Sequence, residues 1–377
     1  MAMSSHSIVK TCISAVNTCV QNLMHMVQYH QVGSQPTSGE PILYFGREIP
    51  TAAELVHGGA VKLQRLQEHF PVSKERCNIL YLVSSFQPSH ADMLIHQAKK
   101  RGIKIVWNQN GISYPASDPE HWKETNADMK KLIHKADYAI YQSKFCKDSA
   151  DEFLGQFKGS QNIIYNCVDT NFFNPRKGAR PAGPLTMLLG GNQYKRYRLE
   201  TALQTVAEVK KEVPDVQLIV TGRVAWEGKN ETDCLRIARR IMENLDITDN
   251  VEFVGQYSQN DAPGLYCRAD ILLHTKWRDP CPGLVIEAMS CGLPVIYSES
   301  GGMPELVWAT AGIGVPAGGS WEEIDPPDPE LLSTAVLQVA DRLDWYSENA
   351  RRCAVERFDL SRYMNQHRSV FEEVLAS

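Results

Sequence analysis

The stretch that decides the fold is "DPCPGLVIEAMSCGLPVIYSESGGMPE", residues 279–305. Its centre, "GLVIEAMSCG", is an apolar run with helical character, and a short apolar run typical of a strand, "PVIYSES", follows at once. A buried strand directly after such a helix is typical of a parallel β-α-β unit. The stretch also carries three acids, Asp279, Glu287 and Glu305. Asp279 and Glu287 lie eight positions apart.

The same alternation of apolar runs and helical text extends to both sides of this stretch. In the first half, "NILYLVSSF" (78–86) and "KIVWNQNG" (104–111) each stand next to helical text, and in the second half "VQLIVTG" (216–222) does so too. Between the halves lies a segment rich in proline and glycine, "NPRKGARPAGP" (174–184). The pattern predicts two doubly wound, Rossmann-like α/β domains with parallel sheets that face a central cleft. Ligands of such sheets bind at the carboxyl ends of the strands.

These breaks suggest a division of the chain into five parts. Apolar positions between Ile8 and Val27 recur at helical spacing and predict an amphipathic helix docked on the body of the protein, with docking on a membrane surface or a partner as the alternative. The predicted parts are a helical extension and linker (1–38), an N-terminal domain (39–174), an interdomain linker (175–184), a C-terminal domain (185–345) and C-terminal helices that pack back on the N-terminal domain (346–377).

Composition narrows the function classes. The 377 residues carry a formal net charge of −5, which argues against a dedicated nucleic-acid binder. No apolar run approaches the roughly 18–20 residues that span a bilayer, and the start of the chain does not resemble a signal peptide. The ten cysteines form no C-x-x-C pair, so we expect reduced thiols in a cytoplasmic protein. Peripheral contact with a membrane stays open, as does the oligomeric state.

Three glycine doublets and one basic segment are candidates for binding an anion. The doublets are Gly58-Gly59, Gly190-Gly191 and Gly301-Gly302, and glycine lets a backbone approach a phosphate closely. Each doublet is equally compatible with a tight turn that requires glycine. Lys195, Arg196 and Arg198 follow a predicted strand, where fixed cations could stabilise negative charge that develops on a leaving diphosphate. At least one of the three is expected to face solvent.

The acids are the more specific feature. Carboxylates accept two hydrogen bonds from neighbouring hydroxyls of a sugar, and Asp279 lies just before the predicted helix whereas Glu287 lies one turn inside it. The alternative is that Asp279 only caps the helix and Glu287 is a solvated acid. Glu287 is embedded in apolar text, however, where an acid needs polar partners. D-x-D, H-E-x-x-H and G-x-S-x-G are all missing, so we expect no metal, no other cofactor and no hydrolase elbow.

In their order along the chain, these motifs resemble a known enzyme family. "HGGAVKLQRLQEHF" (57–70), "YAIYQSKFC" (138–146), "NCVDTNFFNP" (166–175), "GGNQYKR" (190–196) and the opening stretch, with its E-x7-E-like acids, are similar to retaining glycosyltransferases of the GT-B fold, family 4, also called glycosyl transferases group 1. The resemblance covers residues of about 42–310. It implies transfer of a sugar from a nucleotide-diphosphate-sugar, bound mainly by the C-terminal domain, to an acceptor hydroxyl bound mainly by the N-terminal one. The acceptor could be a glycan, a lipid-linked molecule or a small molecule.

The resemblance also implies roles for single residues. Glu287 would hold the donor ribose, Asp279 would touch the sugar ring, and Lys195 with Arg196 would neutralise the diphosphate. On the acceptor side of the cleft lie Asn110 and Ser143. The donor-binding set that it implies is Gly58, Gly59, Gly191, Asn192, Gly283, Leu284, Gly301, Gly302 and Glu305.

The chain departs from the common family pattern at three places. Asp279 replaces the usual Glu and is followed by Pro280-Cys281-Pro282, which resembles an "Asp-Pro-Cys-Pro" subgroup of the family. Asn192 stands near a frequent Arg, and Asn110 stands near a frequent His. Two alternatives therefore stay open beside transfer: a nucleotide-sugar epimerase or hydrolase of the same fold, and a catalytically silent sugar-nucleotide-binding protein.

Overall fold

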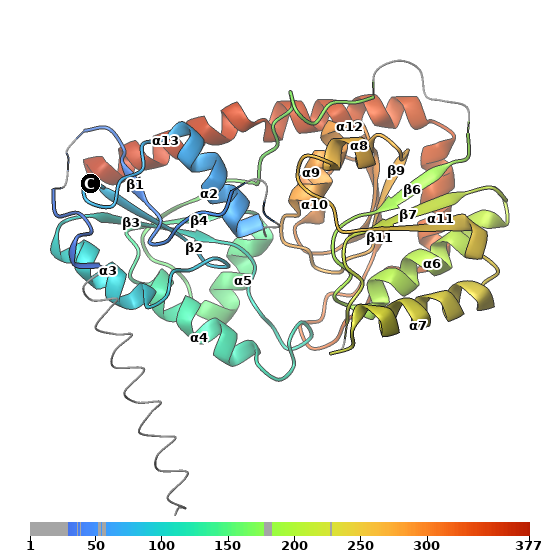
Figure 1. The fold of residues 1–377 in the computed structure, drawn as a ribbon, viewed down its shortest axis with the longest axis horizontal. Helices are drawn as coiled ribbons and strands as arrows, with labels where there is room; N and C mark the ends of the chain where they lie inside the picture. Colours follow the sequence, from blue (N-terminus) through green and yellow to red (C-terminus); the bar gives the residue numbers. More distant parts are fainter. Residues whose placement is uncertain are drawn as a thin grey trace, which may run out of the picture.

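The computed structural model describes residues 29–35, 37, 39–51, 54, 58–176, 183–226 and 228–377. The amphipathic helix predicted between Ile8 and Val27 and most of the linker predicted at 175–184 lie outside these residues. The rest forms two α/β lobes side by side (Figure 1).

The N-terminal lobe is built on a five-stranded parallel sheet in the order β1-β2-β3-β4-β5. One cluster of buried apolar side chains joins the sheet to α3, α4 and α5, and a second, on the other face, joins it to α2 and α13. The strands are β1 (Leu43–Tyr44), β2 (Ile79–Val83), β3 (Lys104–Gln109), β4 (Tyr138–Tyr141) and β5 (Ser160–Ile163). The helices are α2 (Gly58–His69), α3 (Ala91–Lys100), α4 (Trp122–Ile133) and α5 (Lys144–Leu154).

The C-terminal lobe has a six-stranded parallel sheet in the order β11-β10-β9-β6-β7-β8. The strands are β6 (Thr186–Leu189), β7 (Gln217–Thr221), β8 (Val251–Gly255), β9 (Ile271–His274), β10 (Val295–Glu299) and β11 (Gly312–Pro316). Helices α6 (Arg196–Lys210), α7 (Glu231–Asn244) and α11 (Pro329–Ala340) cover one face. On the other face lie α8 (Ala262–Tyr266), α9 (Gly283–Ser290), α10 (Met303–Leu306) and α12 (Leu343–Phe358), and a short 3-10 helix, η1 (Thr248–Asn250), precedes β8.

The order of the second sheet reverses between β6 and β9, which are neighbours although they are far apart in the chain. A crevice forms where strand order reverses in this way, outside the carboxyl ends of the two strands. The loops that leave these ends hold residues 190–195 and 275–282. Both segments belong to the predicted site, so the topology brings them to one edge of the sheet.

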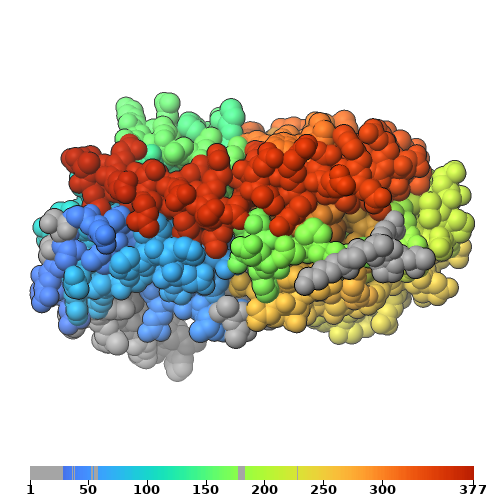
Figure 2. Space-filling view, turned by 90° about the horizontal axis from the view of Figure 1, so that it is seen from above, coloured from blue at the N-terminus to red at the C-terminus, as the bar shows by residue number. Residues whose placement is uncertain are grey.

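Two C-terminal helices cross from one lobe to the other. Helix α12 packs against α9 in the C-terminal lobe, whereas α13 (Leu360–Ala376) buries Tyr363, Phe371 and other apolar side chains against the N-terminal sheet. Asp359 lies between them, accepts a hydrogen bond from Ser361 N and pairs with Val168 in an isolated bridge. Figure 2 shows this C-terminal segment, in red, running along both lobes. Two parallel-sheet α/β domains are thus confirmed, and the chain crosses between them twice.

Candidate functional site

The loop after β6 requires glycine at Gly191 and at its neighbour Gly222. Gly191 has φ of +79°, and a Cβ there would lie 3.1 Å from Leu284 Cδ2. Gly222, after β7, has φ of +82°, and its Cβ would lie 2.5 Å from the carbonyl carbon of Gly191. Asn192 Oδ1 accepts a hydrogen bond of 2.7 Å from Arg223 N. Gly191, Asn192 and Leu284 therefore do meet, in a tightly packed loop with no room for further side chains at the two glycines.

The three cations that follow this loop have three different surroundings. Arg198 is buried and donates to the carbonyl oxygens of Asn192 (2.7 Å) and Gly190 (3.2 Å), so it holds the loop from inside. Burial lowers the pKa of its guanidinium. Arg196 pairs with Glu200 one turn along α6, with an N–O distance of 2.6 Å. Lys195 is exposed, and its ammonium donates to Ser117 O of the other lobe at 3.0 Å.

Asp279 lies in a buried polar cluster at the end of β9. Its Oδ2 lies 3.1 Å from His274 Nε2, and its Oδ1 lies 3.2 Å from Lys276 Nζ. Burial raises the pKa of Asp279, but the charge of Lys276, the His274 hydrogen bond and Arg198 outweigh it, so the pKa is held below its ordinary value. The residue is therefore an anion at neutral pH.

His274 fixes one oxygen of this carboxylate. Its side chain is fully buried, and burial lowers the pKa of the imidazole, so a neutral ring donates its Nε2–H to Asp279. Its Nδ1 has no hydrogen-bond partner in the part of the chain that the structure describes. The residue ends the apolar run "DILLH", and only its position at a strand end marked it in the sequence.

Glu287 has the opposite electrostatic setting. It lies on α9, partly accessible, and Oε2 accepts a hydrogen bond of 2.8 Å from Tyr266 Oη on α8. Desolvation raises the pKa of its carboxyl, which the Tyr266 hydrogen bond and the charge of Arg65 offset only in part. Arg65 belongs to α2 of the N-terminal lobe. Two acids eight residues apart thus occupy different environments, one held by cations and one by a phenol.

The Gly301-Gly302 doublet packs directly against the segment that carries Asp279. Gly301 has φ of +66°, and a Cβ on Gly302 would lie 2.0 Å from Pro280 O. The amide of Gly302 donates to Asp279 O at 2.9 Å. The contact requires glycine, so the doublet fixes the path of the backbone around the acid. Gly283 is the first residue of α9, and its Cβ would lie 3.9 Å from Glu287 Oε1.

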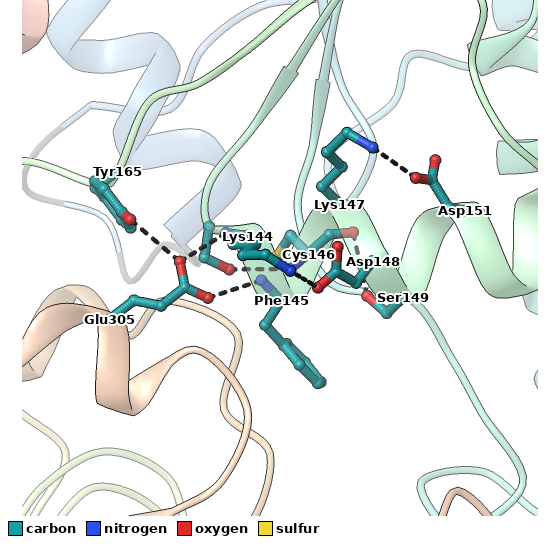
Figure 3. A network of polar contacts seen from close by, with 10 residues as sticks. Lys144, Phe145, Cys146, Lys147, Asp148, Ser149, Asp151, Tyr165 and Glu305 are labelled. Carbon is teal, nitrogen blue, oxygen red and sulfur yellow. Dashed lines mark hydrogen bonds and ion pairs between the residues drawn. The ribbon is translucent and has the colours of Figure 1, made fainter.

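Glu305 takes part in an interdomain contact. Its two carboxylate oxygens accept hydrogen bonds from Lys144 N and Phe145 N, each at 2.7 Å, and Tyr165 Oη donates to it at 3.1 Å (Figure 3). Lys144 and Phe145 are the first two residues of α5 in the N-terminal lobe. A carboxylate from one lobe therefore caps a helix of the other, where the resemblance implied a place in the donor pocket.

The four predicted residues of the N-terminal lobe lie around the carboxyl ends of its strands. Gly58 is exposed at the start of α2, and a Cβ on Gly59 would lie 2.6 Å from Ser85 Oγ. Ser143 is buried, caps α5 through Cys146 N, and its Oγ would lie 3.1 Å from a Cβ on Gly302. Asn110 is buried and donates to Ser85 Oγ at 2.5 Å.

The predicted residues are therefore brought to facing edges of the two lobes, with Arg196 turned along its own helix. Sequence reasoning did not assign roles to His274, Lys276, Tyr266 or Arg65. Among the described residues there is no cluster of three or more His, Cys, Asp or Glu side chains that could hold a metal ion. Within the same residues, no helix has both the length and the apolarity needed to traverse a bilayer.

Comparison with known proteins identifies a domain within this architecture. Residues 171–335 match the family model for "Glycosyl transferases group 1". A human protein of the phosphatidylinositol N-acetylglucosaminyltransferase complex is 24% identical over 275 residues, which are 72% of this chain and 53% of the relative. The N-acetyl-alpha-D-glucosaminyl L-malate synthase of Bacillus anthracis is 22% identical over 315 residues, 80% of this chain and 76% of the relative. The chain thus spans about half the length of the human relative.

Solved structures show the same fold. HepE from Anabaena, in complex with UDP-glucose, superimposes with a TM-score of 0.64 at 18% identity, over 90% of this chain and all of that chain. A sucrose-phosphate synthase from Thermosynechococcus elongatus superimposes with a TM-score of 0.63 at 16% identity, over 84% of this chain and 77% of that chain. These likenesses establish the GT-B fold.

Proposed function

Since residues 171–335 are a glycosyl transferases group 1 domain, we propose that the chain is a retaining hexosyltransferase. It would move a sugar from a nucleotide-diphosphate-sugar to an acceptor hydroxyl without a metal ion or another cofactor. One observation carries the proposal: the matched segment contains β6 to β11 and with them the Gly191 loop, Lys195, Asp279 and Glu287. HepE, which has the same fold, forms a complex with UDP-glucose.

The reaction exchanges one bond at the anomeric carbon for another. The bond to the diphosphate oxygen breaks and its electron pair stays on the nucleotide, while the acceptor oxygen forms a bond on the same face of the sugar. The acceptor proton passes to the departing phosphate. The sugar is oxocarbenium-like in between, so positive charge develops on the ring and negative charge on the diphosphate.

Lys195 is the cation best placed to meet this negative charge. Its ammonium is exposed and bonded only to a neutral carbonyl oxygen, Ser117 O, whereas Arg196 is paired with Glu200 and Arg198 is buried in the loop. Exchanging a carbonyl for a phosphate oxygen gives Lys195 a charge-assisted hydrogen bond, which is about twice as strong as a neutral one. We expect its removal to cost about 3 kcal/mol of transition-state stabilisation.

The two acids would divide the binding of the donor. Glu287 carries one oxygen on Tyr266 and has Oε1 near the first residue of α9, so a ribose hydroxyl can donate to it. Asp279, kept anionic by its cationic neighbours, would accept a hydroxyl of the transferred sugar and oppose positive charge on the ring. Asn110 and Ser143 would border the acceptor.

The acceptor class stays broad within this proposal. Two relatives carry names that contain phosphatidylinositol and L-malate, and another is named for inositol 3-phosphate. We therefore extend the proposal to a small polyol or hydroxy acid, a lipid-linked molecule or a glycan. The enzyme would act in the cytoplasm, at a membrane surface where the acceptor is lipid-linked.

The proposal is tested with the purified chain and a panel of nucleotide sugars. A donor that binds raises the melting temperature by mass action, and release of the nucleoside diphosphate is then measured with and without hydroxyl acceptors. Transfer requires release that depends on an acceptor, and it must fall in both Lys195→Ala and Glu287→Ala. Release independent of acceptor would indicate a hydrolase, and binding without release would indicate a silent binding protein.

A further inference from the structure

A buried lysine lies in the N-terminal lobe beneath the proposed site. Lys62, on α2, is only 6% exposed. Its ammonium donates to Asn108 Oδ1 at 3.0 Å, to Asn110 Oδ1 at 2.6 Å and to Gln142 Oε1 at 2.9 Å. An ammonium has three protons, so all its donors are used, and all three acceptors are neutral amides.

Such a lysine is unfavourable for folding. A buried charge is usually paired with an opposite charge, and here burial lowers the pKa of Lys62 to about 8. The titratable groups around it are neutral near pH 7, because burial raises the pKa of the thiols and the phenol and lowers that of the imidazole to about 3. These groups are Cys146 on α5, Cys167 after β5, Cys281 before α9, Tyr81 on β2 and His367 on α13.

The amides that surround Lys62 lead to the edge of the lobe that faces the other domain. Asn110 follows β3, and its Nδ2 donates to Ser85 Oγ after β2, at 2.5 Å. Ser85 is exposed and lies against the Gly59 backbone at the start of α2. Next to Asn110, a Cβ on Gly111 would lie 3.3 Å from Pro280 Cγ. The edge is therefore directly opposite the segment of Asp279.

Resting on the proposed function, we propose that Lys62 is a positioning residue for the subsite of the transferred sugar. An amide side chain can turn over and exchange its oxygen and nitrogen. The ammonium holds the Asn110 oxygen inward, so the nitrogen faces Ser85 Oγ. Ser85 Oγ accepts this bond and keeps its own O–H to donate to a sugar oxygen. Without Lys62, the amide loses this preference and the hydroxyl loses its orientation.

The binding of UDP-glucose relative to UDP tests this role, because UDP lacks the sugar. By calorimetry at pH 7, Lys62→Met is expected to weaken UDP-glucose about tenfold, the value of one net hydrogen bond, and to leave the UDP affinity unchanged. Ser85→Ala changes an exposed side chain, so it should fold and show the same selective loss. The double variant should lose no more than either single one. Lys130→Met, at an exposed position of α4, is the matched control and should change neither affinity.

The titration of Lys62 gives a second readout. In the wild type, the preference for UDP-glucose over UDP should fall as the pH rises through about 8, and it should be independent of pH between 7 and 9 in Lys62→Met. Equal losses for UDP and UDP-glucose, or additive effects of the two substitutions, would show a merely structural role and overturn the inference. If Lys62→Met does not fold, Ser85→Ala and the wild-type pH profile still decide. A wild type that binds no nucleotide or nucleotide sugar would instead refute the proposed function.

Discussion

Glu305 joins the two lobes by capping α5, and its removal should loosen that joint. The carboxylate accepts two backbone hydrogen bonds of 2.7 Å from Lys144 and Phe145 and a third of 3.1 Å from Tyr165 Oη. In Glu305→Ala, the two amides at the start of α5 lose their acceptor. They also lose an anion at the positive end of the helix.

The expected cost follows from these contacts. A hydrogen bond to a charged group contributes about 1.5–3 kcal/mol, and three would give about 4–9 kcal/mol if they were fully buried. Lys144 is exposed, so water can replace the acceptor there, and the side chain of Glu305 is itself partly accessible. We therefore expect a loss of about 3 kcal/mol in the free energy of unfolding. Glu305→Gln keeps an acceptor without the charge and should lose about half as much.

Urea unfolding measures the loss, and hydrogen exchange of residues 144–154 locates it. Glu305→Ala should speed exchange of the first amides of α5, and the matched substitution of an exposed acid, Glu299→Ala, should not. If Glu305 instead lines the donor pocket, as the resemblance implied, its removal would lower UDP affinity and leave α5 unchanged. That pattern would refute the capping role.

Three further substitutions have opposite expected effects on stability. Asp279→Asn should lower the free energy of unfolding by about 3 kcal/mol at pH 7, because it leaves buried cations unpaired. Since the pKa of Asp279 is lowered in the folded chain, its contribution is present above the ordinary Asp pKa and is lost as pH falls through the folded value, so urea unfolding should show a smaller difference at pH 3 than at pH 7. Glu287→Gln should raise the melting temperature at pH 7 while it weakens UDP binding, because the raised pKa means that the folded chain binds the charged form unfavourably above that value. Gly302→Ala should destabilise by about 3 kcal/mol in calorimetry, since its Cβ would meet Pro280 O at 2.0 Å.

The fold was largely predictable because its strands are buried on both faces. The run "ILYLV" of β2 is buried at every position, and such continuous apolar text between helices indicates a parallel sheet. The destinations of the last two helices are less accessible to this reasoning. Each has an apolar face, but a face does not specify its partner, and α12 and α13 pack on different lobes.

The site was predictable where the chemistry lies within one loop and not where it joins distant segments. Gly191, Asp279 and Gly302 stand in loops whose strand-end position can be deduced from the pattern. Lys62 lies on the same helical face as Leu63 and Leu66, and a lysine on an apolar face is the feature that could have identified it. Its acceptors, however, lie 46 to 80 residues further along the chain.

The contacts between the lobes suggest how donor binding and closure are linked. Lys195 reaches Ser117 O, Trp321 O accepts from Ala116 N at 2.9 Å, and Glu305 caps α5. Glu305 and Lys195 belong to segments that also carry the proposed donor residues, so opening the cleft displaces both from the N-terminal lobe. A diphosphate offers Lys195 a stronger acceptor than a carbonyl oxygen. Donor binding should therefore replace one of the contacts that hold the lobes together and keep the others, which couples the affinity for the donor to the stability of the interface.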